Sequence, residues 1–153
     1  MGSVLGIDPG LSGALAIVDG STGHLVDVLD MPHTRFGKAA IIDGFALLDW
    51  IGDRRIDQIV IEAPSSRPGQ GIASSFQFGR AVGGVEAVMT TLGVPIRHIH
   101  PAVWKKKLGL TANKADSLSL ARIRFGIRDE FRLKKHEGRA EAALLALFAV
   151  GGA

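Results

Sequence analysis

Short apolar runs bounded by turn residues occupy the beginning of the chain. Residues 4–8 form one such run before Pro9-Gly10, and residues 14–18 form another before Asp19-Gly20. Runs of this length between turn residues are typical of strands. We therefore expect these two runs to pair as a hairpin and residues 24–29 to add a third antiparallel strand.

The rest of the chain alternates between helical and strand patterns. Apolar residues recur at helical spacing over residues 41–51, and Gly52 follows where a helix would end. Residues 58–62 return to a strand pattern, and a strand reached through a helix typically runs parallel to its neighbour. The remaining patterns predict a helix over 74–92, a strand over 94–99, a helical turn from Pro101, a helix over 113–125 and a buried helix over 137–150.

This order predicts an α/β fold with a five-stranded mixed sheet and helices on both faces. A length of 153 residues suits a single domain over residues 1–153. Hydrophobic residues make up 46% of the chain, and no apolar run reaches the roughly 18–20 residues of a membrane span. We therefore expect a folded domain with no membrane anchor and no signal peptide. The absence of cysteine excludes disulfides, thiolate metal sites and cysteine nucleophiles.

Basic residues are concentrated in the C-terminal third. Between residues 97 and 139 there are twelve lysines and arginines against four acids, whereas residues 1–96 hold six basic and ten acidic residues. Neutralising phosphates is the main sequence-independent source of affinity for nucleic acids. The asymmetry therefore favours a surface that binds a polyanion, with solvated helix faces as the alternative interpretation.

Four acids stand out because they lie within or at the end of apolar elements. Asp8 and Glu62 each end an apolar strand, and Glu137 and Glu141 lie one turn apart on the helix expected over 137–150. A buried carboxylate costs free energy unless it pairs with a base or binds a metal. Oxygen ligands suit Mg²⁺, and two such ions about 4 Å apart are an arrangement that hydrolyses phosphodiesters. Taken singly, each acid also fits a structural role, such as capping a turn or a helix.

Three segments, in this order, resemble the acidic motifs of a known family. They are Gly6-Ile-Asp-Pro-Gly10 with Ser12-Gly13, then Ile59-Val-Ile-Glu62, and then residues 134–143. Together they resemble Holliday junction resolvases of the RuvC type, in the ribonuclease H and retroviral integrase superfamily. Residues 101–105 and 114–117 resemble the phage and bacterial branch of that family.

The resemblance implies a ribonuclease H-like fold and the activity of a crossover junction endodeoxyribonuclease. Such an enzyme is a homodimer that nicks two strands of a four-way DNA junction with Mg²⁺ or Mn²⁺, two ions per active site. The expected location is the cytoplasm of a bacterial or phage-infected cell.

The resemblance also implies which residues act. Asp8, Glu62 and Glu141 fall on metal-ligand positions, while the remaining position holds Gly138. We expect Glu137, one residue away, to supply the fourth carboxylate, with His136 as the alternative ligand. Lys135 and His136 are further catalytic candidates because they could contact the scissile phosphate.

The expected DNA contacts come from the loop after Glu62, the helix that follows it and the basic third. We expect the lysines at 105–107 and 114 to hold phosphates distant from the cut, and Phe76 or Phe78 to stack on an unpaired base, unless they pack in the core. The full set is Arg67, Phe76, Phe78, Arg80, Lys105, Lys106, Lys107, Lys114, Arg132, Lys134 and Lys135.

Three other functions compete with a junction resolvase. One is a nuclease of the same superfamily that acts on RNA-containing or other branched substrates. Another is an ATP-binding domain of the actin and sugar-kinase type, although that fold normally needs two such domains. The last is a non-catalytic DNA-binding module on the same fold.

Overall fold

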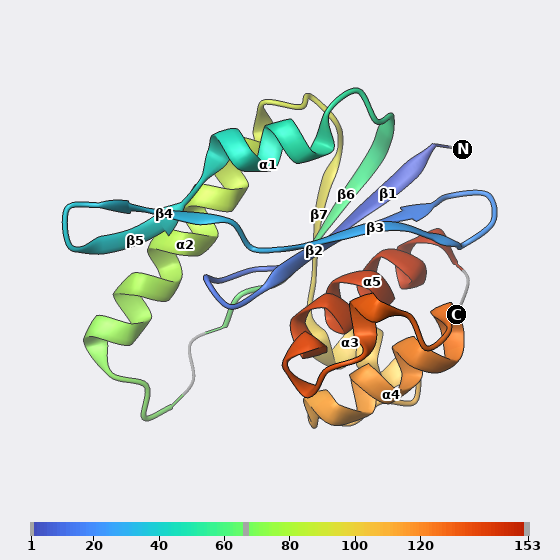
Figure 1. Cartoon of the computed structure of the whole chain (residues 1–153). Coiled ribbons are helices and arrows are strands. Elements are labelled where there is room, and N and C mark those ends of the chain that lie inside the picture. The colour runs from blue at the N-terminus through green and yellow to red at the C-terminus, as the bar shows by residue number, and fades with distance from the viewer. Residues whose placement is uncertain (1, 66–67, 152–153) are drawn as a thin grey trace.

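A five-stranded sheet forms the centre of the molecule in the computed structural model, which describes residues 2–65 and 68–151. Its strand order is β3-β2-β1-β6-β7; β1 pairs with β6 and β6 with β7 in parallel, and the other pairs are antiparallel. Figure 1 shows the strands fanned by their twist. The bounds are β1 Ser3–Asp8, β2 Ala14–Asp19, β3 Leu25–Asp30, β6 Ile56–Glu62 and β7 Ile96–Ile99.

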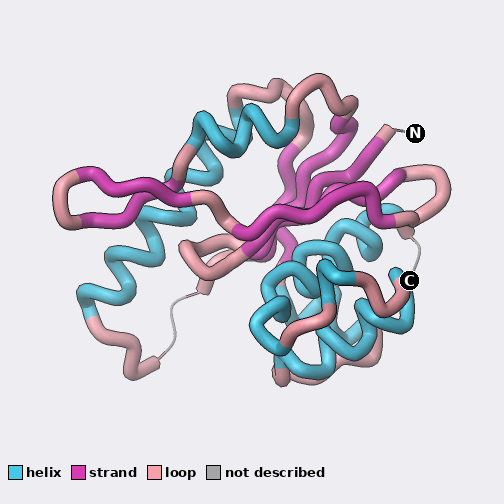
Figure 2. The backbone as a smooth tube through the Cα atoms, in the orientation of Figure 1, coloured by secondary structure: helices cyan, strands magenta, loops and turns pink. Residues whose placement is uncertain are grey.

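Helices cover both faces of this sheet (Figures 1 and 2). The first two helices pack on one face, and the last three pack on the other around α5. Along the described residues no helix is both long and apolar enough to cross a membrane. The bounds are α1 Gly44–Ile51, α2 Ile72–Thr90, α3 Pro101–Lys107, α4 Lys114–Phe125 and α5 Glu137–Val150, with short 3₁₀ turns at Asp129–Phe131 and Lys134–His136.

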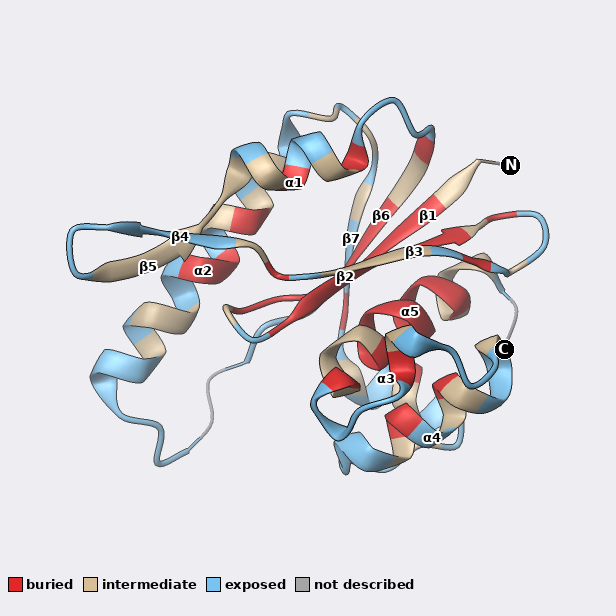
Figure 3. Ribbon diagram, viewed as in Figure 1, coloured by how far each residue is buried: buried red, intermediate tan, exposed pale blue. Residues whose placement is uncertain are grey.

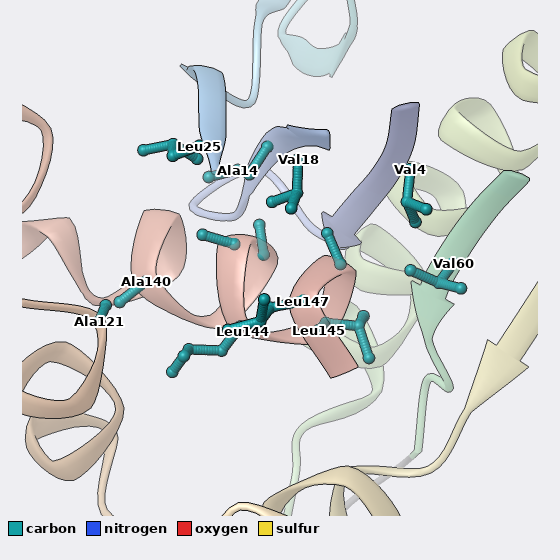
Figure 4. Close-up of a cluster of buried hydrophobic side chains, with 14 of the residues drawn as sticks. Val4, Ala14, Val18, Leu25, Val60, Ala121, Ala140, Leu144, Leu145 and Leu147 are labelled. Atoms are coloured by element: carbon teal, nitrogen blue, oxygen red, sulfur yellow. The ribbon is translucent and has the colours of Figure 1, made fainter. Parts of the chain in front are cut away.

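Alternation along the central strands explains the two cores. On β1, Val4 faces the core under α5, whereas Leu5 and Ile7 face the core under α1 and α2. Successive side chains of a strand point to opposite faces, so a strand that is buried on both faces reads as a continuous apolar run. Figure 4 shows the core under α5, in which Val4, Val18 and Val60 of the sheet belong to one cluster with the leucines of the helix.

Helix α5 lies unusually close to the sheet because of one glycine. A Cβ added at Gly6 would lie 2.1 Å from the carbonyl oxygen of Ala142, so no larger residue fits there without a shift. The helix is buried over most of its length (Figure 3) and contributes Leu144 and Leu145 to the core. In this apolar helix Glu141 is only 1% exposed. The close approach therefore carries a carboxylate into the interior.

The expected fold class is confirmed, and one region was predicted wrongly. Residues 41–42, expected in a helix, belong to a two-stranded hairpin made of β4 His33–Phe36 and β5 Ala39–Ile42. Helix α1 starts only after Asp43, whose side chain accepts a hydrogen bond from the backbone N–H of Ala46 and caps the helix. Residues 41–42 are apolar and lie just before the capped helix. They therefore fit the helical spacing of α1 although they belong to β5.

Candidate active site

Three carboxylates from distant parts of the chain meet at one edge of the sheet. Asp8 ends β1, Glu62 ends β6, and Glu141 comes from α5; each offers an oxygen within 4.8 Å of the others. Strands β1 and β6 are parallel neighbours, with Ile7 opposite Ile61, so their carboxyl ends lie side by side. Because α5 crosses β1 closely at Gly6, Glu141 reaches the same point from the helix layer.

The carboxylates lie at the base of a cleft of about 1370 Å³. Helix α2 lines one wall of the cleft, and α3 with the segment before α4 lines the other. The loop from Asp8 to Gly13 also lines the cleft. The three acids therefore share one cleft with residues of both helix layers.

Asp8 is buried without a partner that fully offsets its charge. Burial raises the pKa of its carboxyl to about 7; the ammonium of Lys114 lowers this pKa in part, and the charges of Glu141 and Glu62 raise it further. Among the described residues, Asp8 forms an ion pair with Lys114, whose Nζ lies 3.7 Å from Oδ2. Because this pKa lies far above the ordinary value of 3.8, the ionised form of Asp8 would be stabilised by a further cation.

Glu141 is the most buried of the three acids, and two lysines approach it. Lys105 donates a hydrogen bond from Nζ to Oε1 over 2.6 Å, and the hydroxyl of Ser117 donates to the same oxygen over 3.3 Å. Oε2 faces Lys114 Nζ at 3.1 Å but accepts no hydrogen bond within the described residues. A buried carboxylate oxygen in this state has a lone pair available for a ligand.

Glu62 is held by a buried tryptophan. Trp104 is fully buried and donates from Nε1 to Glu62 Oε2 over 3.0 Å. Burial and the charge of Glu141 raise the pKa of Glu62, while Lys105 and the Trp104 hydrogen bond lower it. The indole therefore fixes the orientation of one oxygen, and Lys105 Nζ lies 5.3 Å from the centre of the same ring.

The donor set fits a hard divalent cation. All three candidate ligands are carboxylates, and carboxylate oxygens are ligands that suit hard cations such as Mg²⁺ and Mn²⁺ better than softer metals. Lys105 and Lys114 both pair with Glu141, and the raised pKa of Asp8 indicates that these two lysines do not fully offset the charge of the three carboxylates. Asp8, Glu62 and Glu141 are therefore the residues that would hold a metal.

The structure does not bring Glu137 or His136 into this group. Glu137 is half-buried, and the three clustered acids are Asp8, Glu62 and Glu141. His136 is buried; its Nδ1 accepts a hydrogen bond from the backbone N–H of Leu133, and burial lowers its pKa. The residue of α5 that faces Asp8 is instead Gly138, where an added Cβ would lie 3.3 Å from Asp8 Oδ2.

Two lysines expected far from the cut lie inside the acidic cluster. Lys105 and Lys114 both pair with Glu141, and both line the cleft. In the structure these two side chains are held beside the carboxylates, and contacts from them to distant phosphates stay a prediction. Lys106 also lines the cleft, whereas Lys107 is exposed and is not among the residues that line it.

The three basic residues just before α5, at 132, 134 and 135, lie outside the cleft. Lys134 and Lys135 are exposed in the 3₁₀ turn Lys134–His136 and are not among the residues that line the cleft. Arg132 is exposed and lies 3.7 Å from Asp129 in an ion pair. None of the three contacts the carboxylates in the described residues, so direct catalysis by Lys135 has no support from this geometry.

The aromatic and arginine candidates of α2 separate into two groups. Phe78 lines the cleft and lies beside Gly10, whereas Phe76 is 70% exposed and Arg80 is exposed outside the lining. Residue Arg67 lies outside the described residues. Neither phenylalanine belongs to the fully buried core.

Much of the positive charge in the C-terminal third supports the fold. Arg122 donates to the backbone carbonyls of Phe131 and Arg132, each over 2.8 Å. Arg139 pairs with Asp30 through two hydrogen bonds. Arg122 therefore holds α4 against the segment before α5, and Arg139 holds α5 against β3. The number of basic residues in this third thus exceeds the number that are free to bind a polyanion.

Sequence reasoning missed the roles of Trp104 and Ser117. Trp104 carried a usable signal, because a tryptophan beside a lysine run is unusual and a buried indole N–H needs an acceptor. Ser117 carried a weaker one: it lies on the face of α4 that includes Leu118 and Ala121, where a polar residue is out of place. Both residues hold a carboxylate rather than bind a ligand themselves.

The comparisons with known proteins agree with this architecture. No protein-family model matches the chain. The Holliday junction resolvase MOC1, chloroplastic, of Chlamydomonas reinhardtii is 34% identical over 94 residues, which make up 60% of this chain and only 11% of that protein.

Two solved structures of Thermus thermophilus RuvC superpose on nearly the whole chain. One, in complex with a Holliday junction substrate, gives a TM-score of 0.71 at 20% identity and covers 99% of this chain and 95% of the other. The second gives a TM-score of 0.66 at 22% identity, covering 98% and 95%. The chain therefore has the ribonuclease H-like fold of RuvC.

Proposed function

We propose that this protein is a structure-selective endonuclease that resolves four-way or branched DNA junctions by metal-dependent hydrolysis of phosphodiesters. The observation that carries the proposal is the meeting of Asp8, Glu62 and Glu141 within 4.8 Å of one another in a large open cleft. Such a cluster of carboxylates beside lysines suits a negatively charged polymer held by cations.

The carboxylates hold the cofactor in this proposal. Mg²⁺ or Mn²⁺, two ions per active site, would lower the pKa of an attacking water and stabilise the charge that develops on the leaving oxygen. Trp104 keeps one oxygen of Glu62 in place, and Ser117 does the same for Glu141. These hydrogen bonds reduce the rearrangement that metal binding requires.

The side chains of Lys105 and Lys114 differ in how much room they have to move. Lys105 has a side chain only 12% exposed and is fixed against Glu141, so it offsets charge inside the site. The side chain of Lys114 is 46% exposed at its place between Asp8 and Glu141, so it can turn toward a phosphate in the cleft. Lys106 and Phe78 line the same cleft and are the nearest candidates for contacts to the rest of the strand.

The similar proteins support the choice of substrate. The curated relative is named a Holliday junction resolvase, and one RuvC structure with the same fold holds a Holliday junction substrate. The chain spans about a tenth of the length of the curated relative.

We propose a homodimer, because paired nicks on symmetric strands require two active sites related by a twofold axis. We propose the cytoplasm of a bacterial or phage-infected cell as its location.

The test is cleavage of a synthetic four-way junction beside a linear duplex and an RNA–DNA hybrid in Mg²⁺. The control variant is Glu62→Gln, which keeps the side-chain shape and removes the charge. Paired symmetric nicks in the junction only, absent from the variant, are expected. Cleavage of the hybrid would assign the protein to another nuclease of the superfamily, and binding without cleavage would make it a DNA-binding module.

A further inference from the structure

The β4–β5 hairpin is an arm outside the main sheet. It forms a separate two-stranded sheet and extends away from the body of the molecule beside α2 (Figures 1 and 2). All four residues of β4 are exposed, as Figure 3 shows. A two-stranded hairpin is only marginally stable alone, so its position depends on contacts with α2.

Specific contacts fix the hairpin to the wall of the cleft. Gln77 of α2 lines the cleft and donates from Nε2 to the backbone carbonyl of Ala40 in β5 over 2.7 Å. Two helical turns further on, Gly84 leaves room for Ile42, since a Cβ there would lie 3.3 Å from that side chain. The arm is therefore attached to the wall of the cleft that carries Phe78.

The arm is cationic and contains no acid. Between Met31 and Ile42 the charged residues are Arg35 and Lys38, and neither forms an ion pair with any described residue. Phe36 between them is 71% exposed. This contrasts with the basic third, where arginines such as Arg139 are paired within the fold.

We propose that this hairpin binds the phosphate backbone of a duplex arm that leaves the cleft. The inference rests on the proposed function and names a surface for it. Arg35 and Lys38 contact phosphates, and Phe36 packs on sugar edges beside them. Phosphate contacts supply affinity and orientation without sequence information, so the arm aligns the junction over the carboxylates through the connection at Gln77.

The test is the salt dependence of binding to a fluorescent four-way junction, measured by anisotropy with Ca²⁺ in place of Mg²⁺. The double variant Arg35→Ala/Lys38→Ala should bind about five- to tenfold more weakly near 0.15 M salt, with a log–log salt slope lower by about 1–2. The charge reversal Arg35→Glu/Lys38→Glu should weaken binding further. The control Arg55→Ala removes an exposed cation outside both the cleft lining and the basic third, and it should bind nearly as tightly as wild type.

Other outcomes separate the possible errors. An unchanged slope in the hairpin variants, with normal binding by wild type, would overturn the inference and leave the proposed function intact. Loss of the dimer in light scattering would also overturn it, by showing that the hairpin contacts a second copy. If wild type binds no junction, the proposed function itself fails.

Discussion

Lys105 Nζ lies 2.6 Å from Glu141 Oε1, and both side chains are shielded from solvent, at 12% and 1% exposure. An ion pair in such surroundings depends on both members, because removing one leaves the other charge buried. Lys114 approaches the second oxygen of Glu141 from a more exposed position. The buried lysine is thus the main counter-charge of this carboxylate in the protein without metal.

Replacing Lys105 with Met should therefore destabilise the protein without metal. We expect a loss of about 3 kcal/mol in the free energy of unfolding, measured by urea denaturation in EDTA. The control Lys106→Met changes an exposed lysine and should cost less than about 0.5 kcal/mol. Equal denaturation midpoints for the two variants would contradict a counter-charge role.

The stability of the metal-free protein should depend on pH through Asp8. Its folded pKa, raised to about 7, exceeds the ordinary value of 3.8, so ionisation costs more in the folded state than in the unfolded state. Stability contributed by the neutral form is full below about pH 4 and is lost as pH rises toward 7. Asp8→Asn should remove this loss, so that above pH 7 the variant is more stable than wild type by up to about 4 kcal/mol. Thermal denaturation in EDTA from pH 4 to 8 measures the difference, which should vanish at the acid end; parallel curves would contradict it.

Metal binding should distinguish the clustered acids from Glu137. Mg²⁺ at about one hundred times its dissociation constant should stabilise wild type by about 2.7 kcal/mol, seen as a rise in melting temperature. Glu141→Gln should lose most of that rise. Glu137→Gln should keep it, because Glu137 is not part of the carboxylate group. Loss of the rise in Glu137→Gln would restore that residue as a ligand.

Gly6→Ala should displace α5 from the sheet. The added carbon would lie 2.1 Å from the Ala142 carbonyl oxygen, a contact that backbone movement alone can relieve. We expect a loss of about 3 kcal/mol in unfolding free energy and weaker metal binding, because Glu141 moves with the helix. Gly79→Ala is the matched control: its Cβ would meet nothing within 4 Å, and alanine in a helix should raise stability by about 0.5–1 kcal/mol. The same denaturation curve for both variants would show that α5 has room to adjust.

The strands of the five-stranded sheet were predictable from the sequence because apolar runs mark them, and two of these runs end at Asp8 and Glu62. Asp8 and Glu62 close strands that are buried on both faces, and the helix over 137–150 was found at its observed bounds, Glu137–Val150. Burial requires apolar residues at a regular spacing along each strand or helix, and this spacing can be read directly from the sequence.

The environment of the acids was less predictable, because it depends on packing between elements. No periodicity shows that Lys105 and Lys114 turn inward, or that Gly138 faces Asp8 while Glu137 does not. The hairpin was missed because β4 is entirely exposed and so carries no apolar alternation. Its position depends on contacts with α2, at Gln77 and at Gly84, which local sequence does not reveal.

The three carboxylates come from residues 8, 62 and 141, near the start, the middle and the end of the chain. Contacts of such long sequence separation require long loops to close, at a cost in conformational entropy. A chain that has folded only its first hairpin and β6 holds two of the acids and lacks the third. The cluster is complete only when α5 has docked on β1, so a chain in which α5 has not docked holds an incomplete metal site and is expected to leave DNA uncut.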